Sequence, residues 1–577
     1  MSRPKSPVSP VNPVSPAIVA QKSVAQLPRW ALLVLCLAYV VPGFVGRQPW
    51  KNADMEAFGF MLSLARPADG ASANWLQPML AGQAEPSLSL LHTWLGAAAI
   101  GLAPMGWEAS AARLPFMAML ALTLLATWRG VFALARTRAA QPVAFAFGGE
   151  ARPLDYARTL ADGALLALIA CLGLAQLSHE ITPAMSQLCF TSLLFLGLTP
   201  PSWRRRWLHS SAAALGLLGL TLSGAPSMAL LLGAGGWLVL AGSRRNADGG
   251  LRVLELALLG LWLLLSVTLA GALDLWRWRL LPEQALDLHA FARLLLWFTW
   301  PAGPLALWSL WRWRRQLLQA WRIPHIGLPL WFAVVTVGTT WFTGVSDRAL
   351  LSALPAIATL AAFALPTLRR SLAAFIDWFT LLFFTFGALL IWVVWMAMET
   401  GVPAVTARNV ARAAPEFVHQ FSGMAVGLAT LAMLSWLALV RWRTARHRVE
   451  LWKSLVLPAA GTTLCWLLLM TLWLPLLDHG RSYAALLSKL HTQLPAGSCV
   501  HSLGLSNAQN AALLYHGQWR LRAGAAPSTD CNWLVTSSDA LPRVADQLQA
   551  WGWREVQRQR RPSDNKETLV IFQPAVR

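Results

Sequence analysis

Long apolar runs separated by short polar connections recur along almost the whole chain. The runs are long enough to cross about 30 Å of hydrocarbon as helices. About thirteen membrane spans are therefore predicted, at residues 29–46, 112–128, 159–178, 183–200, 208–223, 226–242, 251–273, 291–311, 327–345, 349–367, 373–397, 418–441 and 453–475. A further run at residues 87–104 is interrupted by His92, and we expect it at a membrane interface or half-buried. The pattern predicts a polytopic α-helical membrane protein.

The composition agrees with this interpretation. Of the 577 residues, 56% are hydrophobic and 13% are charged, whereas soluble domains carry about 25% charged residues. A formal net charge of +21 would suggest nucleic-acid binding in a soluble protein. Here most arginines lie in short connections between apolar runs, where they set the topology. Membrane lipids are the expected surroundings, and no nucleic-acid partner is expected.

The charges alternate from one connection to the next. With a cytoplasmic N-terminus, every second connection should be basic, and these connections hold Arg129, Arg136, Arg138, residues 204–206, Arg244, Arg245, Arg312, Arg314, Arg315, Arg369, Arg370 and "RWRTARHR" at 441–448. The opposite connections hold the acids Asp54, Glu56, Glu85, Glu180, Asp274, Glu283, Asp287, Asp347, Glu399 and Glu416. A span at 87–104 would break this alternation. The pattern predicts a cytoplasmic N-terminus and a C-terminus on the opposite side of the membrane.

The two ends of the chain differ from its apolar centre. Residues 1–28 are rich in Pro and Ser, so a disordered cytoplasmic tail is expected. The membrane region is then 29–476, with a large first periplasmic loop at 47–111. The first apolar run lacks a small-x-small cleavage pattern, which favours a retained helix. Residues 477–577 mix alternating apolar runs with helical stretches and predict a small periplasmic α/β domain.

Two cysteines in this last region differ from the other four, which lie in predicted spans. Cys499 and Cys531 begin two predicted strands on the side of the membrane that favours oxidation. A disulfide between them is predicted. The alternative is a pair of free, buried thiols.

The common nucleotide-binding and metal-binding motifs are absent from the sequence. The sequence contains no Walker loop, dinucleotide fingerprint, HExxH motif or CxxC pair. It places carboxylates and arginines at the outer membrane face instead. Arginine binds phosphate bidentately, and a carboxylate can act as a base or hold a divalent metal. This combination suits lipid-linked phosphate donors, while metal dependence stays open.

Three segments carry a resemblance to a known family. They are "PWKNADMEAFGF" at 49–60, "NWLQPMLAGQAEPSLSLLHTWL" at 74–95 and "WEASAARLP" at 107–115. They resemble the first external loop of the aminoarabinose and mannosyl transferases of the GT-C superfamily. The resemblance implies an inverting glycosyltransferase that moves a sugar from polyprenyl phosphate to lipid A or another envelope glycan. About thirteen spans and a C-terminal periplasmic domain also fit that family, and the resemblance implies a location in a bacterial inner membrane.

The resemblance assigns roles to individual residues. Asp54 would be the carboxylate at the reaction centre, either deprotonating an acceptor hydroxyl or ordering the acceptor. Arg348, in a stretch "SDRALLSALPAIATLAAF" that is similar to a family segment, would contact the donor phosphate. Arg113 would be a structural or phosphate contact. Alternatively, Asp54 is a helix N-cap and Arg348 forms a surface ion pair with Asp347.

Glu56, Glu85 and Glu180 are further candidate substrate contacts. Glu180 could bind a metal with His179 or contact a sugar amine, and its alternative role is a turn residue that caps the next helix. Two positions depart from the family pattern. Met55 stands where relatives carry a second acid, and Glu56 cannot replace it because adjacent helical positions point about 100° apart. Glu85 stands where relatives carry a lysine.

These departures keep a second hypothesis open. A non-catalytic protein of the same fold, acting in envelope lipid handling or assembly, would not need the missing acid and lysine. A transporter would be expected to show internal repeats or charges near the middle of its spans, and few are present. The acids at the outer face favour the transferase.

Overall fold

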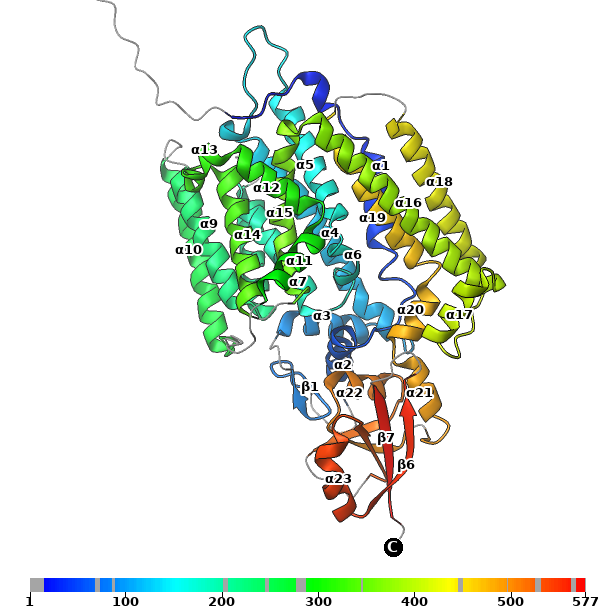
Figure 1. Ribbon diagram of the computed structural model, residues 1–577. Helices are drawn as coiled ribbons and strands as arrows, with labels where there is room; N and C mark the ends of the chain where they lie inside the picture. Colours follow the sequence, from blue (N-terminus) through cyan, green and yellow to red (C-terminus); the bar gives the residue numbers. More distant parts are fainter. Residues whose placement is uncertain are drawn as a thin grey trace, which may run out of the picture.

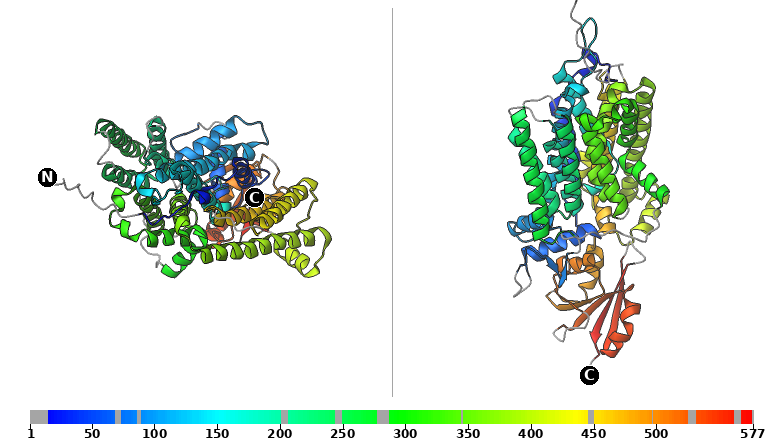
Figure 2. Two further views of the ribbon diagram at one scale, coloured as in Figure 1. Left: turned by 90° about the horizontal axis from the view of Figure 1, so that it is seen from above. Right: turned by 90° about the vertical axis from the view of Figure 1, so that its left-hand side faces the viewer.

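The structure is a computed structural model that describes residues 15–67, 73–85, 89–200, 206–243, 249–276, 287–343, 346–444, 450–495, 497–524, 531–561 and 567–575. Most of the molecule is a bundle of roughly parallel and antiparallel helices, and a smaller α/β domain lies at one end of the bundle (Figure 1, Figure 2). The helices of the bundle are α1 (Arg29–Val40), α4 (Glu108–Ala135), α5 (Pro153–Ala170), α6 (Leu174–Leu177), α7 (Pro183–Gly197), α8 (Arg206–Leu222), α9 (Pro226–Ser243), α10 (Gly249–Ala272), α11 (Leu288–Thr299), α12 (Ala302–Arg312), α13 (Arg314–Leu317), α14 (Pro324–Phe342), α15 (Leu354–Ala364), α16 (Arg370–Thr400), α17 (Ala404–Ala413), α18 (Gly423–Thr444), α19 (Lys453–Leu469) and α20 (Leu474–Arg481).

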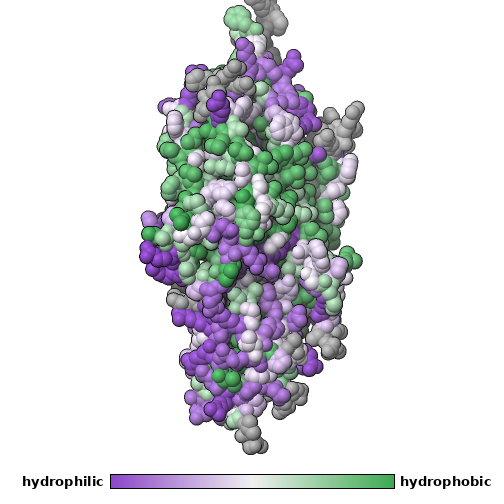
Figure 3. Space-filling model, turned by 90° about the vertical axis from the view of Figure 1, so that its right-hand side faces the viewer, coloured by the Kyte–Doolittle hydropathy of each residue, from purple (hydrophilic) through white to green (hydrophobic). Residues whose placement is uncertain are grey.

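The helical bundle has the dimensions and surface of a membrane protein. Among the described residues, six helical segments are long and apolar enough to span a bilayer, or seven if α19 and α20, bent by 69°, are one broken span. The six are Glu108–Ala135, Val253–Ala272, Pro324–Phe342, Ala349–Thr367, Arg370–Thr400 and Gly423–Arg443. Figure 3 shows a hydrophobic belt across one face of the bundle, between two more hydrophilic ends. The total of thirteen spans and the side that each end faces stay predictions.

Two predicted spans are broken helices. The run at 159–178 forms α5 and α6, and the run at 291–311 forms α11 and α12 on either side of Pro301, which has no backbone N–H to continue a helix. The two breaks meet inside the bundle. The N–H groups of Leu172 and Gly173 donate to the carbonyls of Trp300 and Phe298, at 3.1 and 3.0 Å. Irregular backbone at this depth is stable because each break supplies the partner that the other lacks.

The N-terminal segment is more ordered than its composition predicts. Residues 1–14 lie outside the described residues, but residues 15–28 pack on the bundle. Val19 and Val24 are buried, and Ala20 forms a β-bridge with Glu150. The expected disordered tail of 28 residues is therefore wrong for its second half, because a few apolar side chains among the polar ones suffice to anchor it.

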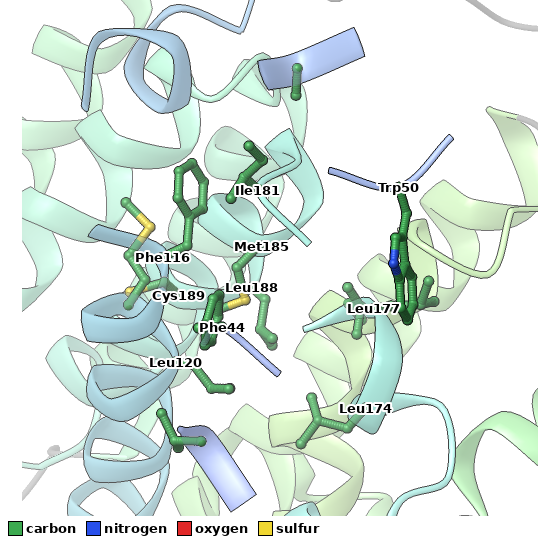
Figure 4. Packing of buried hydrophobic residues seen from close by; sticks show 14 of the residues in the cluster. Phe44, Trp50, Phe116, Leu120, Leu174, Leu177, Ile181, Met185, Leu188 and Cys189 are labelled. Atoms are coloured by element: carbon green, nitrogen blue, oxygen red, sulfur yellow. The ribbon is translucent and has the colours of Figure 1, made fainter. Parts of the chain in front are cut away.

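The predicted first loop contributes two helices and a hairpin at one end of the bundle. They are α2 (Ala53–Ala65), α3 (Leu90–Gly101), and the antiparallel strands β1 (Met79–Leu80) and β2 (Gln83–Ala84). Figure 1 places α2 and α3 between the bundle and the C-terminal domain. An apolar core lies beside this end, with Phe44, Trp50, Phe116 and Ile181 among its side chains (Figure 4).

The C-terminal domain has the predicted α/β composition. Its elements are α21 (Ala484–Leu490), β3 (Cys499–Leu503), α22 (Asn507–Tyr515), β4 (Arg520–Ala523), β5 (Trp533–Ser537), α23 (Leu541–Ala550), β6 (Trp553–Arg560) and β7 (Thr568–Pro574). The sheet has the order β4-β3-β5-β7-β6, in which β3 runs parallel to β4 and β5 while β7 is antiparallel to both of its neighbours. A disulfide joins Cys499 and Cys531 and closes the loop that contains α22 and β4.

The C-terminal domain docks on α2 through α22. Helix α22 begins with a capping box in which the Ser506 hydroxyl accepts from the Gln509 N–H. The Asn507 side chain donates to Glu56 at 2.9 Å. Gly59 lies so close to α22 that an added Cβ would be 2.2 Å from the Cβ of Ala511. The two helices can approach this closely because Gly59 has no side chain.

Gly59→Ala should therefore loosen the docked domain. The added methyl group forces α2 and α22 apart, and overpacking of this kind costs about 1–3 kcal/mol. Limited proteolysis of the purified protein should cut near residue 480 faster than in the wild type. Gly101→Ala is the matched control, because nothing lies within 4 Å of its added Cβ. Equal cleavage of the two variants would contradict the close contact.

Candidate functional site

Asp54 lies at the centre of a buried network of charges. It is the second residue of α2, and its side chain is only 1% exposed. Oδ2 accepts from the N–H of Trp50 at 3.0 Å and from Arg47 Nη2 at 3.1 Å, while Oδ1 accepts from the N–H of Ile181 at 3.0 Å. The N-cap of α2 is Asn52, so the alternative role of Asp54 as N-cap is wrong.

The aspartate joins segments that are distant in sequence. Its bonds tie the end of the first predicted span to the start of α2 and to the connection between α6 and α7. A carboxylate offers about four acceptor positions. Three are used here, and one on Oδ1 is left for a further donor.

Two buried guanidinium groups lie next to Asp54. Arg47 also donates to the carbonyl of His179 at 2.8 Å, and Arg113 donates from Nη1 to the carbonyl of Arg47. Both residues are 2% exposed. Nε and Nη1 of Arg47, and Nε and Nη2 of Arg113, have no hydrogen-bond acceptor among the described residues. Unpaired buried donors are costly, so this arrangement is typical of a site built for an anion.

Glu180 and Arg348 form the second ion pair of the site. Arg348 donates from Nε at 2.7 Å and from Nη2 at 3.2 Å to the two oxygens of Glu180, in a bidentate geometry. Burial raises the pKa of Glu180 above its ordinary value, and the bond to Arg348 opposes part of that rise. The negative charge of Asp54 also acts on both residues. The structure therefore brings Asp54, Arg113, Glu180 and Arg348 into one network of charges.

Asp478 and Trp50 extend the network to the start of the C-terminal region. Trp50 donates from its indole N–H to Asp478 at 2.7 Å, and the same carboxylate accepts from the N–H of Gln48. The guanidinium groups of Arg47 and Arg481 lie 4.5 and 4.9 Å from the centre of the Trp50 ring. These contacts hold the arginines by cation–π attraction.

Stability should depend on the protonation of Asp478, which lies beyond the last predicted span. Burial raises the pKa of Asp478 to about 6, whereas an unfolded aspartate titrates near pH 4. The folded chain then binds more protons between these values, so the free energy of unfolding should fall as the pH rises from about 4 to about 6 and level off above. Thermal unfolding measured across this range should show a smaller slope for Asp478→Asn. An unchanged slope would contradict this assignment.

Two predicted substrate contacts lie outside the cluster. Glu56 is bonded to Asn507 of the C-terminal domain, so its described role is docking. Glu85 is 6% exposed and accepts from the Thr93 hydroxyl at 3.0 Å, with His92 Nε2 at 3.7 Å. It holds the hairpin to α3. Met55 is fully buried in the apolar core, on a different face of α2 from Glu56.

Sequence reasoning missed Arg47, Trp50, Asp478 and Arg481. Arg47 and Trp50 lie directly before Asp54 in "GRQPWKNAD", and Asp478 and Arg481 lie in "LDHGR" just after the last predicted span. Charges at the membrane edge of two connections on the same side were the available signal. Their pairing is not visible in the sequence, because Gln48 and Asp478 are 430 residues apart.

The site offers no ready metal position among its described residues. No group of three His, Cys, Asp or Glu side chains there could hold an ion. His179 is packed among Tyr39, Phe44 and Trp466, and its Nε2 lies 3.1 Å from the carbonyl of Tyr39. The idea that His179 and Glu180 share a metal therefore finds no support in the geometry.

The chain is thus a helical membrane protein with a buried, arginine-rich site at the end of its bundle that meets a small α/β domain. Its fold is similar to that of ArnT from Cupriavidus metallidurans, as seen in crystal structures of ArnT bound to undecaprenyl phosphate and in the apo state. The likeness covers 94% of this chain and 98% of ArnT, with TM-scores of 0.58 and 0.59 and sequence identities of 15% and 14%. No protein-family model and no curated protein sequence matches the chain. The fold implied by the first-loop resemblance is confirmed.

Proposed function

We propose that this protein is a membrane glycosyltransferase that moves a sugar from a polyprenyl-phosphate donor to an envelope acceptor, with Asp54 at the centre of its site. The first-loop resemblance and the fold shared with ArnT, which was solved with undecaprenyl phosphate, support the proposal. In this proposal the acceptor is lipid A or another periplasmic glycan, the sugar is a hexose or pentose, and the reaction inverts the anomeric centre.

The observation that carries the proposal is the pair of buried arginines beside Asp54. Arg47 and Arg113 together leave four buried nitrogen atoms without an acceptor. Arginine N–H groups match the oxygens of a phosphate in geometry and charge. A phosphate of the donor lipid would accept these bonds and offset the cost of the buried charges. Arg348, which is partly exposed and already bound to Glu180, would guide the same phosphate.

The proposed reaction is a single displacement. An acceptor oxygen attacks the anomeric carbon while the bond from that carbon to the phosphate oxygen breaks, and polyprenyl phosphate leaves with the electron pair. The arginines stabilise the negative charge that grows on the leaving phosphate. A hydroxyl acceptor also loses a proton, whereas an acceptor phosphate needs no base. A divalent metal could supply the same charge stabilisation, but no described residue set favours one.

Asp54 is proposed to order the site and one reactant. Three of its acceptor positions hold Arg47, Trp50 and Ile181 in place. The remaining position on Oδ1 can accept one hydrogen bond from an acceptor hydroxyl. Because three of its acceptor positions are already occupied, we assign Asp54 the role of a positioning group. An acceptor that is itself an anion therefore fits this site best.

One observation favours the second candidate function. Glu85, which stands where relatives carry a lysine, is a buried acid that accepts a hydrogen bond from Thr93. The donor phosphate thus lacks one positive contact. A non-catalytic protein that binds polyprenyl phosphate for envelope lipid handling or assembly could keep the arginines and lose the transfer.

A transfer assay and a binding assay on purified full-length protein in lipid nanodiscs distinguish these two functions. The protein is incubated with polyprenyl-phosphate sugars and lipid A, and products are measured by mass spectrometry, while binding of polyprenyl phosphate is measured in parallel. Transfer with release of polyprenyl phosphate supports the proposed function. Binding without transfer to any envelope acceptor supports the second candidate. Neither binding nor transfer would refute both.

A further inference from the structure

A second group of arginines lies at the end of the bundle opposite Asp54. Here the beginning of α1, the end of α4 and the beginning of α5 surround a cavity of about 1110 Å³. In Figure 1 the dark-blue segment that leads into α1 lies at this end, while α2 and the C-terminal domain lie at the other. The cavity shares no lining residue with the Asp54 site.

The cavity is strongly basic. Four arginines line it, Arg29, Arg129, Arg136 and Arg158, against a single carboxylate, that of Asp162. Asp162 already accepts from the indole N–H of Trp128 at 2.8 Å. Within the described part of the chain, none of the four guanidinium groups donates a hydrogen bond. The Nε atom of Arg129 is buried without an acceptor.

The remaining wall of the cavity is apolar. Leu32, Leu33, Phe132 and Leu154 line it beside the arginines. Leu33 is 64% exposed, and Leu37, one helical turn further along α1, is 60% exposed. An apolar surface thus continues from the cavity along the outside of α1 toward the hydrophobic belt. A ligand that fills the site needs an anionic group and an attached hydrocarbon chain.

We propose that this cavity binds the phosphate headgroup of an anionic phospholipid, with its acyl chains lying along α1. Pockets for drug-sized ligands hold about 300–1,000 Å³, so a cavity of this volume also has room for a glycerol phosphate headgroup. The arginine distribution predicts that this end faces the cytoplasm. Basic pockets between helices on that side are suited to anionic headgroups. The inference does not depend on the proposed transfer reaction.

Native mass spectrometry of the full chain in neutral detergent tests the proposal. The wild type is expected to bind phosphatidylglycerol in preference to phosphatidylcholine with the same acyl chains. Arg129→Gln combined with Arg158→Gln should weaken phosphatidylglycerol binding about tenfold or more, because charge-assisted bonds to the phosphate are lost. Arg129→Lys with Arg158→Lys keeps the charge and should retain part of the binding.

The control is Arg138→Gln combined with Arg152→Gln. Both arginines are exposed at the same end of the bundle and do not line the cavity, so their loss should leave phosphatidylglycerol binding unchanged. Equal weakening by the two glutamine pairs would overturn the proposal in favour of general surface attraction. Displacement of the lipid by an equal concentration of inorganic phosphate would also overturn it and indicate a small soluble phosphate ligand. If the double variant does not purify as a single species, Arg129→Gln alone is compared with Arg138→Gln.

Discussion

The Asp54→Asn variant should lose sugar transfer by about 10²–10³-fold, as expected when a buried charge that organises a reaction site is removed. An amide has one acceptor oxygen and one donor group. Asp54 accepts hydrogen bonds from the N–H groups of Ile181 and Trp50 and from Arg47. The NH₂ group of the asparagine would place a donor against at least one of these donors. Arg47 would also lose its only carboxylate partner in the described structure. A buried charge left without its partner costs about 3–5 kcal/mol.

Transfer and thermal unfolding should be measured on the same preparation. Glu416→Gln is the control, because Glu416 forms an exposed ion pair with Lys489 and carries a carboxylate outside the site. It should change both quantities little. Full transfer by Asp54→Asn, with lowered stability, would make Asp54 a structural residue only. Unchanged stability would contradict the hydrogen bonds described for its carboxylate.

The Arg113→Met variant should lose sugar transfer without losing stability. The guanidinium of Arg113 is buried with Nε and Nη2 unpaired, and each unpaired group costs about 1–3 kcal/mol. Methionine fills a similar volume without a charge. Only the bond to the carbonyl of Arg47 is lost. The unfolding temperature should therefore stay equal or rise, while transfer falls about 100-fold because a contact to the donor phosphate is missing.

Arg66→Met is the matched control for this experiment. Arg66 pairs with Glu108 at the same end of the bundle, but its side chain is 31% exposed. Its replacement should cost less than about 1 kcal/mol and leave transfer intact. Lower stability together with normal transfer in Arg113→Met would show that Arg113 is a structural residue and would refute its proposed role with phosphate.

The fold class and part of the candidate site could be predicted from the sequence. Hydropathy alone predicted a helix at each apolar run, because a helix satisfies its own backbone and its length follows from bilayer thickness. It could not predict the break after Ala170, which is stabilised by contacts with a distant segment, whereas Pro301 is a local signal for the break before Ala302. The resemblance indicated Asp54 and Arg348.

The rest of the site depends on pairing that is not local. Asp478 meets Trp50 only after the whole bundle has folded, and no spacing rule connects them. Glu85 was expected at the substrate because of its position in the motif, and in the structure its buried carboxylate accepts from the Thr93 hydroxyl. A motif therefore indicates which segment contributes to a site, while packing determines which of its side chains reach it.

The paired helix breaks also have a consequence for biosynthesis. Leu172 and Gly173 leave the ribosome long before Trp300 and Phe298, whose carbonyls they need as partners. Until then, the earlier break would expose unpaired amide groups to lipid, which costs several kcal/mol for each group. The first helices should therefore be held by the insertion machinery, or stay near the aqueous interface, until the later pair arrives. We therefore expect membrane integration of this chain to be a concerted step and not a strict sequence of single helices.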